Sequence, residues 1–359
     1  MSEAGTWTRH ENGWVQLRVP LPFSLKWVNS YVLPDGAGYS VVDPGLRSAD
    51  AEACWEAALG ALGIGWRDVT GIVLTHHHPD HYGLSGWMQE RTGASVYLSA
   101  EARVYAEKLW GEGETFSDEL IAAFRSYGLP EKLVPAMQAH LEGVKAQVNP
   151  PPREVRLVEA GAPLAFGGAS WTPIAGEGHA PGHLSYYDEA RGLLLCGDQV
   201  LPDITPNIGW MPDADPDPLG AFLDSLEALR PLEVARAYPG HRDPFDRFGE
   251  RVEAIVAHHE RRLRRMAELA AEAGEPLSAF EMCERLFGAR LQGNAHNLRF
   301  AMAETIAHLV RLERSGRVER VEESADGAVR QAVGKPLIRF RPSEDMRQAV
   351  GTKADGTTA

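Results

Sequence analysis

The sequence predicts a mixed α/β protein that ends in a mostly helical module. Two observations lead to this prediction. Segments with strand and helix patterns alternate early in the chain, and three helical segments followed by two short strands form its last part. A chain of 359 residues is long for one domain, so we expect a main domain at residues 1–248 and a smaller one at 249–343. The polar end, residues 344–359, is expected to be a disordered tail.

The composition is that of a folded globular protein, with 44% hydrophobic and 24% charged residues. A formal net charge of -14 repels polyanions and lowers the expectation of dedicated nucleic-acid binding.

The N-terminal segment MSEAGTWTRHENGW lacks the apolar core of a secretory signal, and no apolar run approaches the roughly 20 residues of a membrane helix. Three widely spaced cysteines indicate a reducing compartment. We therefore expect a cytoplasmic protein with a small-molecule substrate and no membrane partner.

The first part of the chain carries strands and one helix. Runs of β-branched and aromatic residues predict the strands, and the turn-forming residues 34–38 predict a hairpin. Apolar residues such as Trp55 and Leu59 recur at helical spacing. The elements expected here are strands at residues 15–19, 27–33, 39–42 and 71–74 and a helix at residues 49–62.

A helical stretch interrupts the strands. After a strand at residues 94–98, residues 101–148 have helical patterns broken at Gly111-Glu112-Gly113 and at Gly128-Leu129-Pro130. Short strands return between residues 155 and 196. We expect the helical stretch to be an insert in the main domain.

The last part of the chain has the element order of a winged-helix module. Helices are expected at residues 251–273, 279–287 and 298–314, and strands at 318–321 and 337–340 around a turn at 324–327. A local basic group consists of Arg261, Arg262, Arg264 and Arg265. It could contact phosphates, but acidic neighbours favour a solvated helix face or a homodimer contact. Nucleic acid is thus an alternative partner that is not favoured.

The stretch THHHPDHYG holds four histidines and an aspartate directly after an apolar strand. Imidazole and carboxylate together suit zinc, iron or manganese. His76 and His78 are two apart in an extended segment and can project to one side, while Asp80 and His81 could serve a second ion. The alternative is a histidine-rich surface loop.

Three later segments supply further ligand-type residues. GEGHAPGHLSYY offers His179 and His183, LLLCGDQ offers Asp198, and ARAYPGHRDP offers His241. Each repeats one order, in which an apolar strand is followed by a glycine and then by a ligand-type residue. Singly, each could be a turn, cap or surface residue, but a catalytic metal needs three or four protein ligands. The recurrence therefore indicates a metal site.

With these motifs the chain resembles a metallo-β-lactamase-fold hydrolase of the glyoxalase II-like branch, over roughly residues 14–248. The resemblance implies an αββα sandwich with two metals at one edge between the sheets. It implies that one metal is bound by His76, His78 and His179, that the other is bound by Asp80, His81 and His241, and that Asp198 bridges both. Cys196, near the position of a ligand in many true lactamases, is expected to be a buried strand residue.

This ligand set predicts hydrolytic chemistry. The cofactors are expected to be two divalent ions, with zinc favoured and iron or manganese as alternatives. Two such ions would share a hydroxide as the nucleophile. Asp80 and Asp198 are the predicted catalytic carboxylates, and Asp80 should also orient the hydroxide. His183 is expected to hold a ligand's tautomer by a hydrogen bond, and His77 is expected not to be a ligand.

Two segments are candidates for the substrate pocket. The helical insert could cap the metals with Tyr105 and Trp110, although such aromatics more often form a segment's own core. The loop after Asp198 offers Asn207, Trp210 and Met211, and the alternative is an ordinary proline-rich loop.

We expect a binuclear metal hydrolase that cleaves a small ester, thioester or lactone, with hydroxyacylglutathione hydrolase as the model activity. One alternative is a phosphodiesterase or ribonuclease that uses the same metals and holds RNA with the winged helix. Another is a sulfur dioxygenase with a single iron, against which the complete second ligand set argues.

Overall fold

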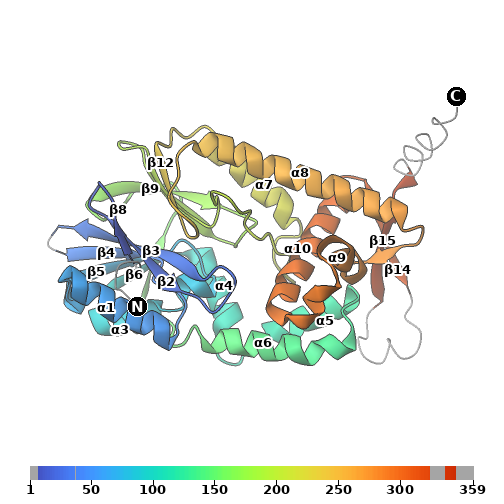
Figure 1. Cartoon of the computed structure of the whole chain (residues 1–359), viewed down its shortest axis with the longest axis horizontal. Coiled ribbons are helices and arrows are strands. Elements are labelled where there is room, and N and C mark those ends of the chain that lie inside the picture. The colour runs from blue at the N-terminus through green and yellow to red at the C-terminus, as the bar shows by residue number, and fades with distance from the viewer. Residues whose placement is uncertain (1–6, 37, 324–335, 345–359) are drawn as a thin grey trace. The chain divides into compact units, whose positions relative to one another are not determined.

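The computed structural model describes residues 7–36, 38–323 and 336–344. By their internal contacts, two compact units are distinguished (Figure 1). The first contains residues 1–114, 143–206 and 225–253, and the second contains residues 115–142, 207–224 and 254–359. This grouping is discontinuous in the sequence, whereas the boundary expected near residue 248 is sequential and stays a prediction.

A seven-stranded sheet forms half of the first unit, in the order β1-β2-β3-β4-β5-β6-β7. Its strands are β1 (Trp7–Arg9), β2 (Val15–Pro20), β3 (Trp27–Asp35), β4 (Gly38–Val42), β5 (Val69–Val73), β6 (Ser95–Ser99) and β7 (Val155–Val158). Strands β1 to β4 pair antiparallel and β4 to β7 pair parallel. Parallel pairs need crossover connections, which helices supply here.

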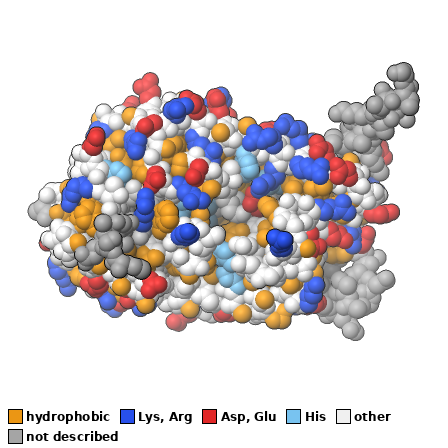
Figure 2. Space-filling view, viewed as in Figure 1, with side chains coloured by type: hydrophobic (Ala, Val, Ile, Leu, Met, Phe, Trp, Pro, Cys, Tyr) orange, Lys and Arg blue, Asp and Glu red, His pale blue; other side chains and the backbone are white. Residues whose placement is uncertain are grey.

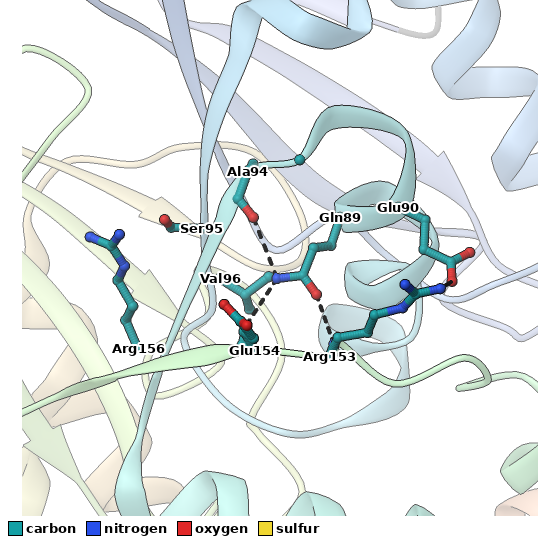
Figure 3. Close-up of a pocket in the computed structure, with 9 residues that line it drawn as sticks. Gln89, Glu90, Ala94, Ser95, Val96, Arg153, Glu154 and Arg156 are labelled. Carbon is teal, nitrogen blue, oxygen red and sulfur yellow. Dashed lines mark hydrogen bonds and ion pairs between the residues drawn. The ribbon is translucent and has the colours of Figure 1, made fainter.

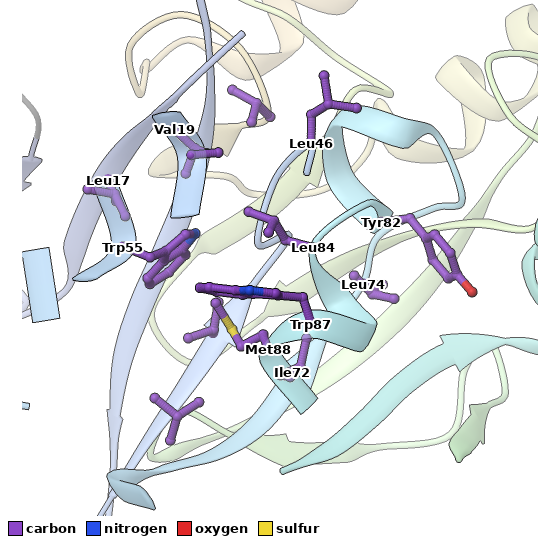
Figure 4. Packing of buried hydrophobic residues seen from close by; sticks show 14 of the residues in the cluster. Leu17, Val19, Leu46, Trp55, Ile72, Leu74, Tyr82, Leu84, Trp87 and Met88 are labelled. Atoms are coloured by element: carbon purple, nitrogen blue, oxygen red, sulfur yellow. The ribbon is translucent and has the colours of Figure 1, made fainter. Parts of the chain in front are cut away.

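Helices α1 (Ala49–Leu62) and α3 (Ser85–Thr92) pack on the outer face of this sheet. The Ser48 side chain accepts a hydrogen bond from the Ala51 amide and starts α1, and Gly63, with φ of 69°, ends it. Trp55 and Trp87 lie in the apolar layer between helices and sheet (Figure 4). Each aromatic side chain buries a large apolar area, so this layer fixes the helices against the strands.

A five-stranded sheet, in the order β12-β11-β10-β9-β8, forms the other half of the unit. Its strands are β8 (Leu164–Phe166), β9 (Ala169–Gly176), β10 (His183–Asp188), β11 (Leu193–Gly197) and β12 (Arg236–Pro239). A second apolar cluster joins residues of both sheets, with Trp14 in contact with the rings of Trp171 and Tyr238. The two sheets therefore form a sandwich, and the predicted mixed α/β fold is confirmed.

The helical stretch expected at residues 101–148 consists of α4 (Ala100–Trp110), α5 (Phe116–Ser126) and α6 (Val134–Ala146), and its assignment as an insert of the main domain stays a prediction. The first unit takes α4, and the second takes α5 and most of α6. Helix α7 (Pro218–Leu229) lies after the long loop that follows β11.

The C-terminal elements are α8 (Phe248–Glu272), β13 (Leu277–Ser278), α9 (Ala279–Phe287), α10 (Ala295–Arg314), β14 (Val318–Glu323) and β15 (Leu337–Pro342). The last two strands pair antiparallel, and β13 pairs with β15. Strands β1 and β13 were not expected from the sequence, because two or three residues are too short for a periodic pattern. The turn at 324–327 and residues 345–359 of the predicted tail lie outside the described residues.

Within the described residues, no helix is both long enough and apolar enough to cross a membrane. Helix α10 is buried along most of its length, and only Asn297 and Arg314 on it are well exposed.

A pair of buried histidines joins α8 and α10 in the second unit. His308 Nδ1 donates to the Glu304 carbonyl, so its Nε2 accepts from His259 Nδ1 at 3.1 Å. Both rings are fully buried. Burial lowers the pKa of His259 to about 2 and that of His308 to about 3. Both side chains are therefore neutral in the folded protein at physiological pH.

We expect this pair to make the second unit sensitive to acid. Each folded pKa lies below the unfolded value near 6.5, so the unfolded chain binds more protons as the pH falls from about 6.5 toward 3, and stability is lost over that range. The loss should be at most about 1.4 kcal/mol per histidine and pH unit. Urea unfolding at pH 7 and pH 5 should show a smaller drop for the double variant His259→Gln/His308→Gln than for the wild type. An equal loss of unfolding free energy in the variant and the wild type would contradict the role of these two histidines in acid sensitivity.

Candidate metal centre

The predicted ligands lie just beyond the ends of four strands, and Asp80 and His81 belong to the short helix α2 (Pro79–Tyr82). Residues 75–81 follow β5, His179 follows β9, Asp198 follows β11 and His241 follows β12. Strands β9 and β11 both pair antiparallel with β10, and β11 pairs parallel with β12, so all three end at the same edge of their sheet. This topology explains why residues far apart in the sequence converge.

All seven predicted ligands come together in three overlapping groups, in each of which the ligand atoms lie within 4.8 Å of one another. The groups are His76, His78 and His179; His76, His81 and Asp198; and Asp80, His81 and His241. The first and third groups are the two sets expected from the sequence. The structure thus brings the residues together, and the binding of metal by them stays a prediction.

Asp198 lies between the two sets. Its Oδ1 is 3.5 Å from His81 Nε2, and its Oδ2 is 3.3 Å from His241 Nε2 and 3.7 Å from His179 Nε2. Its carboxylate therefore faces members of both sets. Asp80 Oδ2 is 3.2 Å from His241 Nε2, and Asp80 is the more exposed of the two carboxylates.

Asp43, at the end of β4, holds the histidine loop, and the sequence analysis missed it. Its Oδ1 accepts from the Thr75 amide at 2.8 Å, and its Oδ2 accepts from Thr75 Oγ1 at 2.7 Å and from His81 Nδ1 at 2.9 Å. Asp43 has φ of 51°, in the left-handed region that Asp tolerates better than most residues. The available signal was the run VVDPG, which follows the same strand-then-carboxylate order as Asp198.

These hydrogen bonds determine which ring nitrogen each ligand presents. The one proton of Thr75 Oγ1 goes to Asp43, so this oxygen accepts from His76 Nδ1 at 2.8 Å. His241 Nδ1 donates to the Trp27 carbonyl at 3.1 Å. In His76, His81 and His241 the outer nitrogen is therefore occupied and Nε2 is directed inward, as in metal-binding histidines.

Gly240 shows why a glycine precedes a ligand in the sequence pattern. A Cβ atom at this position would lie 2.3 Å from Asp198 Oδ1 and 2.5 Å from a ring carbon of His81. No side chain fits there unless the ligands move apart.

The charges around the centre favour a cation. Burial opposes a charge on His81, but Asp198, Asp80 and Asp43 raise its pKa well above its usual value. Burial likewise opposes charge on His241, whose pKa Asp198 and Asp80 raise to about 10. In contrast, burial and the neighbouring His81 hold the pKa of His76 well below its usual value. Positive charge is thus stabilised beside the two carboxylates.

The residues present fit divalent ions. Five imidazoles and two carboxylates form a donor set that suits zinc, iron or manganese. His76 Nε2 is buried and makes no hydrogen bond within the described residues, which costs free energy that coordination would recover.

The two remaining histidines of the motifs are buried. Neither ring nitrogen of His183 makes a hydrogen bond within the described chain, so the expected bond to a ligand is not seen, although its ring lies 5.0 Å from that of His76. His77 belongs to none of the three groups, and its ring stacks on Tyr105.

The candidate pocket residues make contacts within their own units. Trp110 Nε1 donates to the His77 carbonyl. In the second unit, Asn207 donates to Glu304 and Trp210 contacts the Tyr127 ring. Met211 is half-buried. Their role, with that of Tyr105, in binding substrate stays a prediction. Cys196 is fully buried, as expected, and lies in none of the three groups.

A model of the metallo-beta-lactamase superfamily matches residues 28–241, and a model of the metallo-beta-lactamase-like C-terminal domain matches residues 266–333. A crystal structure of a metallo-beta-lactamase family protein from Thermus thermophilus is 34% identical, with a TM-score of 0.79, over 92% of this chain and 98% of that one.

Several relatives have names that describe an activity, and two of them span different shares of this chain. A probable metallo-hydrolase of Bacillus subtilis is 26% identical over 83% of this chain and 92% of its own length. A hydroxyacylglutathione hydrolase of Dechloromonas aromatica is 26% identical over 55% of this chain and 52% of its own length.

We expect Asp43→Asn to weaken metal binding. The amide cannot accept all three hydrogen bonds, so Thr75 and His81 lose their fixed orientation. Losing such a partner typically costs about 10- to 100-fold in metal affinity. Asp35→Asn is the matched control, because Asp35 also accepts from a serine hydroxyl, that of Ser40. Metal content after dialysis against graded chelator should fall for Asp43→Asn only, and equal retention in both variants would contradict the role of Asp43.

Proposed function

Because the chain belongs to the metallo-beta-lactamase superfamily, we propose that it is a hydrolase that uses two divalent ions to cleave a small thioester or related acyl ester. The observation that carries the proposal is the position of Asp198 between two complete ligand sets. A site for one ion would not need Asp80, His81 and His241 grouped beside the first set. This grouping favours a hydrolase over a sulfur dioxygenase with a single iron.

Bound divalent ions would supply a Lewis acid for the acyl carbonyl and lower the pKa of water enough to provide hydroxide at neutral pH. The residues of the chain would position these reactants. Asp80 and His78 are the only members of the seven that are partly exposed, so we place the approach of substrate on their side. Asp80 would orient the nucleophile through its carboxylate.

Support for a thioester substrate comes from the similarity to a hydroxyacylglutathione hydrolase. That likeness spans about half of both chains, so the leaving group is part of the proposal. Zinc is the favoured metal, because it has no redox chemistry and suits imidazole and carboxylate ligands.

We propose that the C-terminal elements form a winged helix that serves in packing or homodimer contact. The order α8, β13, α9, α10, β14, β15 supports the first part of this proposal.

A nucleic-acid role is disfavoured, because burial leaves α10 few exposed residues with which to enter a groove of nucleic acid. Arg262 pairs with Glu304 and Arg265 with Glu268 and Glu272, so half of the local basic group is neutralised. Figure 2 shows basic side chains lying among acidic ones.

The proposal predicts turnover of S-lactoylglutathione by the zinc-loaded protein. Asp198→Ala should lower kcat by more than the roughly 10- to 100-fold typical of losing an outer partner of a ligand, because it removes the carboxylate that lies between the two sets. Asp50→Asn, at an exposed acid in the first turn of α1, is the control. Absence of turnover with two metals bound would exclude glutathione thioesters and direct the search to lactones and phosphodiesters.

A further inference from the structure

Strand β3 of the first sheet contacts the turn that carries His241, at the end of β12 in the second sheet. Three residues at alternate positions of β3 make these contacts, through main-chain and side-chain groups. The Trp27 carbonyl accepts from His241 Nδ1, and Tyr31 Oη donates to the Pro239 carbonyl at 2.8 Å. Asn29 lies between them.

Asn29 bonds three carbonyl groups of this turn. Its amide N–H donates to the Gly240 carbonyl at 2.7 Å, and its side-chain Nδ2 donates to the Pro239 carbonyl at 3.0 Å and to the Arg242 carbonyl. Because carbonyls only accept, the side-chain nitrogen must face them. Asn29 is fully buried, and Gln16 Nε2 donates to its Oδ1 at 2.8 Å, which holds the amide in this orientation.

The turn needs this support because Arg242 has φ of 71°, in the left-handed region that non-glycine residues seldom adopt. Such a conformation persists only where the surroundings hold it. The carbonyls that flank His241 on both sides are bound by one residue, so displacement of Asn29 would loosen the His241 backbone, although the Gly240 amide would still donate to the Gly197 carbonyl. None of these hydrogen bonds of Asn29 involves His76, His78 or His179.

We propose that Asn29 is a positioning residue that sets the place of His241 and thereby the affinity of one metal position, the one with Asp80, His81 and His241. This inference rests on the proposed binuclear site but not on the substrate. Under this proposal, only one of the two metal positions depends on β3. Substitution of Asn29 should leave the metal affinity of the position with His76, His78 and His179 unchanged and lower that of the other position.

The test is titration of the metal-free protein with Co²⁺, followed by visible absorption, with stoichiometry measured by mass spectrometry. Wild type should bind two equivalents. Asn29→Ala should keep one equivalent at wild-type affinity and bind the other about 10- to 100-fold more weakly. Tyr31→Phe, which keeps the ring and removes one hydrogen bond to the turn, should weaken the same step by less and serves if Asn29→Ala does not fold.

Gln89 offers a matched control. Its side chain also bonds three backbone groups, donating to the carbonyls of Ala94 and Glu154 and accepting from the Arg153 amide. It does so in a hollow of about 520 Å³ lined by none of the seven ligands (Figure 3). Gln89→Ala should therefore leave both affinities unchanged.

The proposal would be overturned if Asn29→Ala and Tyr31→Phe weakened both Co²⁺ binding steps equally. It would also be overturned if these variants weakened neither step. Wild type that binds a single equivalent would overturn it together with the binuclear site. Two equivalents without thioester turnover would instead reject the proposed substrate and leave the role of Asn29 in force.

Discussion

The rest of the site depends on the hydrogen bonds that the Asp43 carboxylate accepts from Thr75 and His81. This carboxylate joins the end of β4 to the loop after β5 through Thr75 and turns His81 inward. Because the Thr75 hydroxyl donates its proton to Asp43, it must accept from His76, so one carboxylate determines the tautomer of two ligands. His241 also has its Nδ1 occupied and its Nε2 directed inward, because Nδ1 donates to the Trp27 carbonyl on β3. The site is thus assembled by both sheets of the sandwich.

Much of the site could be predicted from the sequence, because metal ligands leave strong local signals. Four histidines and an aspartate within one short loop are unusual, and the strand, glycine and ligand order recurs at Asp198 and His241. The structure gives a physical reason for that order at Gly240, where a side chain would displace Asp198. Asp43 and Asn29 were missed because their roles depend on partners in other strands. An aspartate after a strand or an asparagine within one has many ordinary explanations.

The fold could be predicted where patterns are long. Helices α1 and α9 begin and end at the expected residues. Short strands such as β1 carry too few residues to be recognised. The division into two units could not be predicted from the sequence either. Residues 115–142 and 207–224 belong with the C-terminal elements because of tertiary contacts, which leave no local sequence pattern. The buried pair of His259 and His308 joins α8 to α10, and the His259 ring contacts that of Phe222; this pair had no sequence signature.

The central claim is that two ions bind between the Nε2 atoms and carboxylates of the seven ligands. A crystal structure of the zinc-loaded protein, with anomalous data at the zinc edge, tests it most directly. We predict two peaks, one beside His76, His78 and His179 and one beside Asp80, His81 and His241, with Asp198 bound to both and with Nε2 as the ligand atom of His76, His81 and His241. A single peak, or coordination through Nδ1 of His81, would contradict the account.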